Sequence, residues 1–217
     1  MKPIVIFGAG QIAELAKFYF EDLGYHVAAF TVDDAYAKVS VFHGLPLLPF
    51  SMVDEIYNPS EYLMFVALSY TGVNRVRTQK VLEAKQRGYQ LISYLGRNIT
   101  AFNNEIGEHA FILEDNTLQP FAVIGKNVFM WSGNHIGHHS RIEDNCFISS
   151  HCVISGNVVV GEGTFIGVNS TIRDGITIGK QCIIGAGSLV LKDLPDFSVT
   201  TNPASEISKV PSTRMKF

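Results

Sequence analysis

Residues 136–166, IGHHSRIEDNCFISSHCVISGNVVVGEGTFI, carry a large aliphatic residue at every sixth position. The same spacing runs without a gap from Ile106 to Val190, so that fifteen successive positions hold Ile, Leu, Met or Val. It breaks on both sides, at Thr100 and at Asp196. A repeat of six residues fits neither the 3.6-residue period of an α-helix nor the two-residue period of a plain strand.

Short strands joined by two-residue corners explain this repeat. The residue four places after each aliphatic position is usually small, and the residues two and three places after it include typical turn pairs such as Asp144 with Asn145 and Glu162 with Gly163. The sequence therefore predicts a triangular prism of parallel strands, a hexapeptide β-helix. Fifteen hexads make five coils, about 24 Å tall at roughly 4.8 Å per strand layer.

The N-terminal residues alternate between apolar strand patterns and helical patterns. Strands are expected at residues 2–7, 26–30, 45–48, 62–68 and 90–95. Helices are expected after Gly10 up to about Leu23, at 51–57 and at 74–87. This order predicts a small parallel α/β sheet, a Rossmann-like half-domain. We expect that domain over residues 1–97, a linker near 96–100, the β-helix over 98–195, and a C-terminal tail over 196–217 that packs on the last coil.

Composition narrows the class of protein. The 217 residues are 47% apolar, which is enough for a substantial core, and the net charge of −3 provides no basic surface for nucleic acid. No stretch has the apolar length of a membrane span, and the chain does not begin with a secretion signal, so we expect a cytoplasmic protein. The three cysteines, Cys146, Cys152 and Cys182, share the small inward phase of the repeat and are expected to pack in the core.

A glycine motif follows the first predicted strand. Gly8, Gly10 and Ala13 form a Gly-x-Gly-x-x-Ala pattern that suits a phosphate at a helix N-terminus, because small residues let the backbone approach the anion. A structural tight turn would have the same spacing. Asp33 and Asp34 end the second strand, where a carboxylate can accept hydrogen bonds from a ribose or a base. A dehydrogenase is disfavoured because the domain lacks a second mononucleotide-binding half.

Four of the seven histidines, His135, His138, His139 and His151, lie within seventeen residues. His138 and His139 occupy a corner pair, so their side chains are expected to project from a prism edge. Histidine is a suitable general base for acyl transfer, whereas exposed corner histidines can also be ordinary surface residues. Asn134 stacks on Asn116 one coil earlier, which predicts an inward asparagine ladder, although it also lies next to the histidines.

The whole chain resembles the bacterial nucleotide-sugar N-acyltransferases of the left-handed β-helix superfamily, the sialic acid O-acetyltransferase-like and bacillosamine N-acetyltransferase-like group. The resemblance rests on GAGQ at 8–11, TVDD at 31–34, ALSY at 67–70 and the run from 133 to 161. It implies a left-handed prism and a homotrimer with acyl-CoA in the cleft between two prisms. In the family the base is the first residue of a His-acid pair, which falls on His138. The acid position is His139 here, a departure from the family.

The resemblance also implies where the substrates bind. The acyl-CoA is expected to run along Gly156, Val168 and Ala186, near His151. The nucleotide of the acceptor is expected to contact the N-terminal domain at Gly10, Gln11, Asp33, Asp34, Ser69 and Tyr70. His138 is expected to act as the base, with Asn134 and His139 as neighbours in the catalytic group, and no metal is expected.

We expect transfer of an acyl group from acetyl-CoA, or from a 3-hydroxybutyryl-type CoA, to the amine of a UDP-, dTDP- or GDP-linked amino-deoxy sugar. The product would serve surface polysaccharide or glycan synthesis, such as O-antigen and lipopolysaccharide. Three alternatives remain open: a zinc enzyme like the γ-type carbonic anhydrases, a sugar O-acetyltransferase, and a non-catalytic scaffold that binds nucleotide sugars. The histidine spacings of 3, 1 and 12 disfavour the zinc enzyme.

Overall fold

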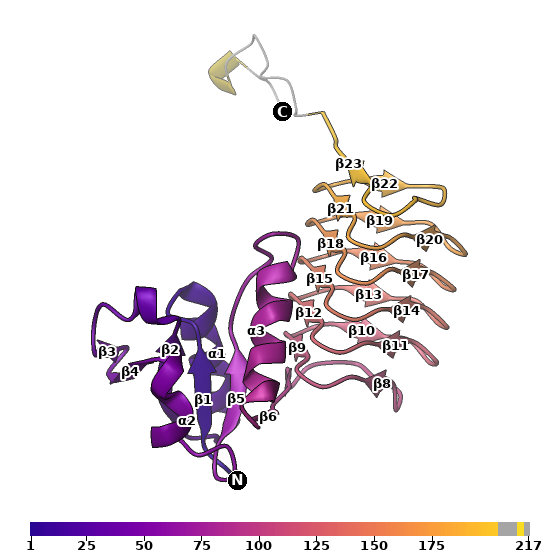
Figure 1. Ribbon diagram of the computed structural model, residues 1–217. Coiled ribbons are helices and arrows are strands. Elements are labelled where there is room, and N and C mark those ends of the chain that lie inside the picture. Colours follow the sequence, from indigo (N-terminus) through magenta and orange to yellow (C-terminus); the bar gives the residue numbers. More distant parts are fainter. Residues whose placement is uncertain (204–211, 215–217) are drawn as a thin grey trace.

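The structure is a computed structural model that describes residues 1–203 and 212–214. An α/β domain lies against one side of a tall parallel β-helix (Figure 1). The domain contains the helices α1 (Gln11–Asp22), α2 (Val53–Ile56) and α3 (Arg75–Gln86), with short 3-10 turns at Asp34–Tyr36 and Phe50–Met52. Its strands are β1 (Ile4–Phe7), β2 (Val27–Val32), β3 (Val41–Phe42), β4 (Leu45–Pro49), β5 (Leu63–Val66) and β6 (Gln90–Leu91).

These strands form one six-stranded sheet in the order β3-β4-β2-β1-β5-β6. All pairs are parallel except β3 with β4. The chain moves from β1 to β2 on one side and returns to β5 on the other. The carboxyl ends of β1 and β5 therefore mark the reversal point at which open α/β sheets bind ligands. This confirms the predicted Rossmann-like arrangement.

The predicted strand at 90–95 is two strands that belong to different sheets. β6 completes the sheet of the α/β domain, whereas β7 (Tyr94–Leu95) pairs with β9 (Phe111–Ile112) in the prism. The chain changes sheets at Ser93, whose Oγ accepts a hydrogen bond from the N–H of Ala110 at 3.0 Å. The expected linker near Gly96 is thus already bonded to the prism, because its N–H donates to the carbonyl of Ile112.

The prism has three faces of parallel two-residue strands. The His135 face contains β10 (Thr117–Leu118), β13 (His135–Ile136), β16 (Val153–Ile154), β19 (Thr171–Ile172) and β22 (Leu189–Val190). The Arg141 face contains β8 (Glu105–Ile106), β11 (Val123–Ile124), β14 (Arg141–Ile142), β17 (Val159–Val160) and β20 (Thr177–Ile178). The phenylalanine face contains β7, β9, β12 (Phe129–Met130), β15 (Phe147–Ile148), β18 (Phe165–Ile166), β21 (Ile183–Ile184) and β23 (Val199–Thr200).

The prism core is the aliphatic repeat that the sequence predicts. Positions from Ile112 to Val190 in that phase are buried, and Ile106 packs against them from the first coil. All three cysteines are free and buried in the same core, as predicted. Each side-chain thiol donates to a backbone carbonyl of a later stretch, for example Cys152 to Gly167 at 3.2 Å. Because the small inward residues leave room for the neighbouring aliphatic side chain, the repeat packs without large rings inside.

Phenyl rings cover the outside of the third face and join it to the α/β domain. Phe111, Phe129 and Phe147 repeat at intervals of eighteen residues and are buried together with Phe65 of β5. The Phe65 and Phe129 rings are stacked, with centroids 5.7 Å apart. At roughly 25 cal/mol per Å² of apolar surface, this ladder stabilises the contact between the two parts of the chain by several kcal/mol.

The prism extends slightly beyond both ends of the sixfold repeat. β7 adds a strand before the first coil, and β23 pairs with β21 after the last one. The beginning of the predicted tail therefore packs on the last coil, whereas residues 204–211 and 215–217 lie outside the described residues. Within the described part of the chain, no helix has the length and apolar character needed to cross a membrane.

Candidate active site

The three edges of the prism carry different residues. The histidine corner holds the pairs at 120–121, 138–139, 156–157, 174–175 and 192–193, between the His135 face and the Arg141 face. The asparagine corner holds 108–109, 126–127, 144–145, 162–163 and 180–181. The third corner holds 114–115, 132–133, 150–151, 168–169 and 186–187. Most second residues have positive φ, such as His139 at 60° and Asn127 at 55°, which confirms the predicted corner pairs.

His138 projects from the histidine corner and is exposed. Its imidazole lies over Gly156 of the next coil, where an added Cβ would fall 2.7 Å from both Cε1 and Nε2. Glycine is therefore required at position 156 for the ring to lie there. The backbone N–H of His138 donates to Oε1 of Gln119 at 2.9 Å, which fixes the corner from the coil before.

His139 supplies the partner for the His138 ring. The two Nδ1 atoms are 3.1 Å apart, so one ring donates its proton and the other accepts it. When His138 donates, its Nε2 carries the lone pair and faces the space over Gly156. The His139 ring is supported by the ring of Phe121, whose centroid is 4.7 Å away. The residue that contacts Nδ1 of His138 is thus an imidazole, at the position where the resemblance led us to expect an acid.

Two other predicted neighbours of His138 have different roles. Asn134 is only 2% exposed, and its Nδ2 donates to the carbonyl of Trp131 while its Oδ1 accepts from the N–H of Cys152 at 2.8 Å. Its own N–H donates to Oδ1 of Asn116. The prediction of an inward ladder is confirmed. The side-chain polar atoms of Asn134 bond to Trp131 and Cys152 inside the prism, and none of these bonds reaches the His138 ring. His135 belongs to β13 on the His135 face and does not lie at an edge.

Three of the residues expected near acyl-CoA lie at the third corner. The ring of His151 covers Gly133, where an added Cβ would fall 2.5 Å from Nδ1. Val168 is 44% exposed, and Ala186 is exposed one coil further on. Gly156 lies at the histidine corner instead. The structure therefore divides the expected acyl-CoA residues between two edges of one prism.

The predicted nucleotide-binding residues gather at the carboxyl edge of the α/β sheet. Gly8 has a φ of 128°, and a Cβ there would lie 2.9 Å from the carbonyl oxygen of Ala67, so glycine lets β1 and β5 approach closely. Gly10 precedes the first turn of α1, and its carbonyl accepts from Ala13 and Glu14. Gln11 is exposed beside it. The first turn of α1 follows the carboxyl end of β1, an order in which unbonded N–H groups at a helix start can face an anion.

Asp33 and Asp34 are partly engaged by the protein. Lys80 of α3 contacts Oδ1 of Asp33 and Oε2 of Glu83, each at 2.6 Å. Burial lowers the pKa of Lys80, but hydrogen bonds to these two carboxylates and attraction to their charges together raise it overall. Asp34 accepts the N–H of Ser51, and this contact lowers the pKa of its carboxyl. Lys80 contacts only Oδ1 of Asp33, and Asp34 bonds to the backbone of the turn at Ser51.

Ser69 and Tyr70 lie where the α/β domain meets the prism. The Tyr70 ring contacts Phe165 and Phe147, with centroids 4.6 and 5.0 Å away. A hollow of about 180 Å³ opens beside them, lined by Ser69, Tyr70, Trp131, Phe147, Ser149, Ser150 and Val168. The hollow thus joins residues expected for the acceptor to Val168, which is expected for acyl-CoA.

The histidine corner and this hollow lie apart in one chain. The α/β domain covers the phenylalanine face, and the histidine corner is the edge opposite that face. Gly133 at the third corner and His138 are separated by five residues of extended chain, about 16 Å. Residues of one chain therefore do not bring an acceptor in the hollow to the Nε2 of His138.

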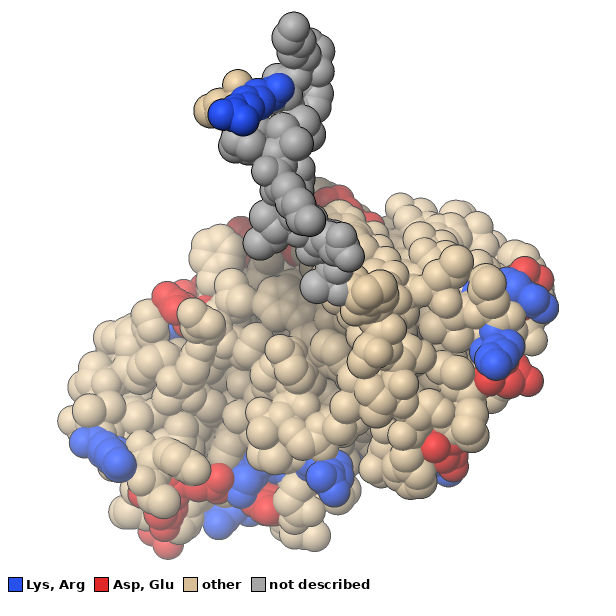
Figure 2. Space-filling view, turned by 90° about the horizontal axis from the view of Figure 1, so that it is seen from above, with Lys and Arg blue, Asp and Glu red and all other residues tan. Residues whose placement is uncertain are grey.

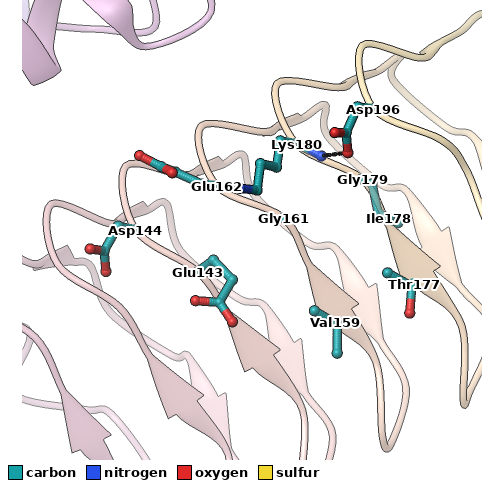
Figure 3. A pocket seen from close by; sticks show the side chains of 10 residues that line it. All are labelled: Glu143, Asp144, Val159, Gly161, Glu162, Thr177, Ile178, Gly179, Lys180 and Asp196. Atoms are coloured by element: carbon teal, nitrogen blue, oxygen red, sulfur yellow. Dashed lines mark hydrogen bonds between the residues drawn. The ribbon is translucent and has the colours of Figure 1, made fainter.

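A separate cleft of about 400 Å³ lies at the asparagine corner and the Arg141 face (Figure 3). Its lining side chains come from successive coils and include Glu143, Glu162 and Lys180. The N–H of Lys180 donates to Oδ1 of Asp196 at 2.8 Å, which closes one end. None of the predicted site residues lines this cleft, so its size alone does not make it the active site.

The buried cysteines and the metal-ligating side chains provide no alternative site in the described residues. Burial raises the pKa of the Cys146 thiol to about 12 and that of Cys152 to about 11, so neither is a thiolate nucleophile at neutral pH. Among residues 1–203 and 212–214, no three His, Cys, Asp or Glu side chains lie close enough to hold a metal ion. In the view from above, charged side chains lie mainly around the rim and both signs are mixed (Figure 2).

Comparison with known proteins shows the fold. Residues 121–156 and 157–192 match the family of bacterial transferase hexapeptide repeats, described as six repeats. A mutant of perosamine N-acetyltransferase from Caulobacter crescentus, solved with CoA and GDP-perosamine, is 24% identical, with 92% of this chain and 93% of that chain covered and a TM-score of 0.83. The chain has the left-handed hexapeptide β-helix fold.

Two further solved structures share this left-handed β-helix and its N-terminal domain. The acetyltransferase domain of PglB from Neisseria gonorrhoeae is 23% identical over 92% of this chain and 96% of that chain, with a TM-score of 0.80. WeeI from Acinetobacter baumannii is 22% identical over 92% and 96%, with a TM-score of 0.74. No curated protein matched the sequence.

Sequence reasoning missed a buried polar group that joins the left-handed β-helix to the α/β domain. His109, Asn127 and Arg77 are each at most 1% exposed. Nε2 of His109 accepts the N–H of Val66 at 2.9 Å, and its Nδ1–H donates to Oδ1 of Asn127 at 2.8 Å. The eighteen-residue spacing of His109, Asn127 and Asn145 was an available signal, but Arg77 gives no such signal because its partners are distant in sequence.

Proposed function

We propose that this protein transfers an acyl group from acyl-CoA to the amine of a nucleotide-linked amino-deoxy sugar. The observation that carries the proposal is the His138 ring, which lies over Gly156 with Nδ1 bonded to His139 and Nε2 open to a substrate. The solved structures of similar fold, which are named as N-acetyltransferases or acetyltransferase domains and include complexes with CoA and GDP-perosamine, support the same reaction.

The reaction follows from the chemistry of these groups. The sugar amine attacks the thioester carbonyl, and Nε2 of His138 takes the proton that the nitrogen loses as the C–N bond forms. The C–S bond then breaks, and the same proton passes to the sulfur, so the products are an amide and free CoA. The N–H of Gly156 donates to no backbone acceptor among the described residues, and Gly156 itself lies under the His138 ring. We propose that this N–H stabilises the oxyanion.

We propose that the active site forms between two copies of the chain in a homotrimer. One copy contributes the histidine corner with His138 and Gly156, and its neighbour contributes the third corner with Val168 and the Ser69–Tyr70 hollow. This arrangement is supported by the separation of these groups within one chain. The acyl-CoA would then lie between the histidine corner of one copy and the third corner of its neighbour, along the backbone of both prisms.

The sugar nucleotide is placed at the carboxyl edge of the α/β sheet. The phosphates face the start of α1 at Gly10 and Gln11, and the nucleoside meets the free oxygen of Asp33. Acetyl-CoA is the proposed donor and 3-hydroxybutyryl-CoA the second. The product enters cytoplasmic synthesis of surface glycans such as O-antigen.

A panel of donors and acceptors tests this proposal. Acetyl-CoA and 3-hydroxybutyryl-CoA are combined with UDP-, dTDP- and GDP-linked 3-amino and 4-amino dideoxyhexoses, and free thiol release is measured together with product mass. Matched sugars that carry a hydroxyl in place of the amine distinguish N-acylation from O-acylation. We expect thiol release only with an amino sugar. Absence of release with every pair would contradict the proposal and favour a binding scaffold.

Complementation tests the shared site. His138→Ala and Tyr70→Ala chains are each expected to form inactive homotrimers. Co-expression of the two variants with different affinity tags gives mixed trimers in which one interface keeps both native partners. We expect tandem-purified mixed trimers to regain a substantial part of wild-type activity. Mixed trimers as inactive as the parents would place the whole site within one chain.

A further inference from the structure

The loop at residues 69–74 between β5 and α3 has a strained backbone. Gly72, Val73 and Asn74 have φ values of 63°, 56° and 65° in succession. Left-handed φ is easily reached by glycine and tolerated by asparagine, but it is costly for a β-branched residue such as valine. Strain of this kind, of order 1–3 kcal/mol per residue, persists only where surrounding contacts hold it.

Asn74 supplies one of those contacts. Its side chain is fully buried, and Nδ2 donates to the carbonyl of Gly163 at 2.9 Å and to that of Thr164 at 3.4 Å. Both acceptors belong to the fourth coil of the prism. Asn74 precedes α3, yet its side chain caps no N–H of that helix. The residue type most suited to a helix N-cap therefore ties the loop to the prism instead.

Arg77 supplies the second contact. On the prism side, its guanidinium donates to Oδ1 of Asn127 at 3.0 Å and to the carbonyls of Asn127, Asn145 and Cys146. On the loop side, Nη1 donates to Oδ1 of Asn74 at 3.1 Å and to the carbonyl of Ser69 at 3.4 Å. The group also lies 4.2 Å from the centroid of the Phe129 ring.

Burial of the charged Arg77 side chain is costly, so its hydrogen bonds to the loop and to the prism have to be kept. Complete burial lowers the pKa of Arg77, but the guanidinium remains charged at neutral pH. A buried charge is tolerated only when its donors are satisfied, and here they are divided between the loop and three residues of the prism. One side chain thus fixes the distance between Ser69 and the asparagine corner.

We propose that Asn74 and Arg77 are positioning residues that set the height of the 69–74 loop on the prism. Ser69 and Tyr70 then meet the acceptor at a fixed level relative to the coils that carry acyl-CoA. The inference rests on the proposed function, in which Ser69 and Tyr70 bind the nucleotide sugar. It assigns acceptor placement to contacts with the prism rather than to the α/β domain alone.

A matched pair of variants tests the inference. Asn74→Gly keeps the left-handed backbone, because glycine adopts φ near 65° freely, and removes both hydrogen bonds to the prism. Lys85→Gln removes the ion pair between Lys85 and Glu108, which also joins α3 to the prism but lies far from the loop. Arg77→Lys, which keeps the charge without the planar fork, is the second test variant.

For Asn74→Gly we expect the KM for the nucleotide amino sugar to rise at least about tenfold. The KM for acyl-CoA should stay within about twofold, and Lys85→Gln should leave both constants within twofold. Arg77→Lys should share the acceptor-specific rise. A purely structural role would lower the melting temperature and move both KM values together, or neither, and either result would overturn the inference.

Amide hydrogen exchange separates this inference from the proposed function. Exchange of residues 69–74 should accelerate at least tenfold in Asn74→Gly and remain at the wild-type rate in Lys85→Gln, whatever reaction the protein performs. Unchanged exchange of the loop in Asn74→Gly would overturn the positioning role. Accelerated exchange in a protein that acylates no amino sugar would support the positioning role of Asn74 and would contradict only the proposed function.

Discussion

His109 and His138 both stand at corners of the same prism, yet their surroundings give them opposite roles. Both ring nitrogens of His109 are used inside the protein, by Val66 and Asn127, because the α/β domain covers that edge. His138 lies on the edge opposite the covered face, and only its Nδ1 is bonded. A repeat makes corners alike in backbone, and the covering of each face decides which side chains remain available for chemistry.

The largest effect should come from removing the available ring. His138→Ala is expected to lower kcat by roughly 10²–10⁴-fold, the usual contribution of a general base. Thiol release with the preferred substrate pair measures this, and circular dichroism checks the fold. His26→Ala, which removes an exposed histidine of the α/β domain, should retain wild-type kcat. Near-normal turnover of His138→Ala across pH would remove it from the role of base.

Moving the ring without removing it should have a smaller effect. Gly156→Ala adds a Cβ that would lie 2.7 Å from Nε2 of His138, so the imidazole has to turn away. Displacement of a base by about 1 Å is expected to reduce kcat by about 10²-fold. The melting temperature should change little, because the flexible end of an exposed side chain gives way. Wild-type kcat in this variant would show that the ring position over Gly156 is irrelevant.

Removal of His139, which contacts Nδ1 of His138, should have the next largest effect on kcat. His139→Ala should lower kcat about tenfold, because His138 loses the contact that fixes its tautomer. His139→Glu restores an acceptor and adds the negative charge that stabilises an imidazolium, so its kcat should equal or exceed that of the wild type. The kcat values of the two variants show whether His139 acts by orienting the His138 ring or only by filling space beside it. If Glu impairs kcat as much as Ala does, His139 does not orient the base.

Substitution of His109, at the corner covered by the α/β domain, should change the free energy of unfolding rather than the action of the base His138. His109→Leu leaves the buried N–H of Val66 without an acceptor and should lower the free energy of unfolding by roughly 1–3 kcal/mol. Urea titration at pH 7 measures this loss. A decrease below 0.5 kcal/mol would mean that the polar contact contributes nothing beyond packing.

The same histidine should give stability a dependence on pH. Burial, opposed only partly by the bond to Asn127, lowers the pKa of His109 from 6.5 to about 3. Between these values the unfolded chain binds a proton that the folded chain excludes. The contribution of His109 is therefore complete above pH 6.5 and falls as the pH is lowered toward 3, by up to about 1.4 kcal/mol per pH unit. His109→Leu should lack this part of the slope in urea titrations between pH 4 and 7.

The smallest effect on catalysis is expected at the core thiols. Cys152→Ala should leave kcat unchanged, because the buried thiol is not a nucleophile, and should cost about 1 kcal/mol of stability from the lost packing. Turnover and urea titration of the same preparation measure both. Loss of turnover in a folded Cys152→Ala protein would revive an acyl-enzyme route.

The sequence predicted the prism better than the contacts across it. The sixfold repeat is set by residues close in the chain, so the core from Ile112 to Val190, the corner pairs and the exposed place of His138 followed from spacing alone. The division of the strand at 90–95 did not, because the two halves pair with partners in different sheets. Phe111, Phe129 and Phe147 face outward in every coil, and only the docked domain explains why such rings are tolerated.

The candidate site divides in the same way. Residue types and positions pointed to His138 and His139, and the structure brings their rings together. Asn134 lies next to them in sequence but is directed inward by its own ladder. Arg77 could not be predicted, because its six acceptors come from segments up to 69 residues away and include four backbone carbonyls.

The central claim is that His138 holds its proton on Nδ1 and leaves Nε2 free, and the tautomers of the histidine rings test it most directly. Long-range ¹⁵N–¹H correlation spectra of protein labelled with ¹⁵N-histidine, assigned with His138→Ala and His109→Leu, report which nitrogen is protonated in each neutral ring. We predict the Nδ1–H form for both His109 and His138, with an Nε2 shift typical of a hydrogen-bonded acceptor in His109 and of an open one in His138. A neutral His138 with its proton on Nε2 would contradict the account.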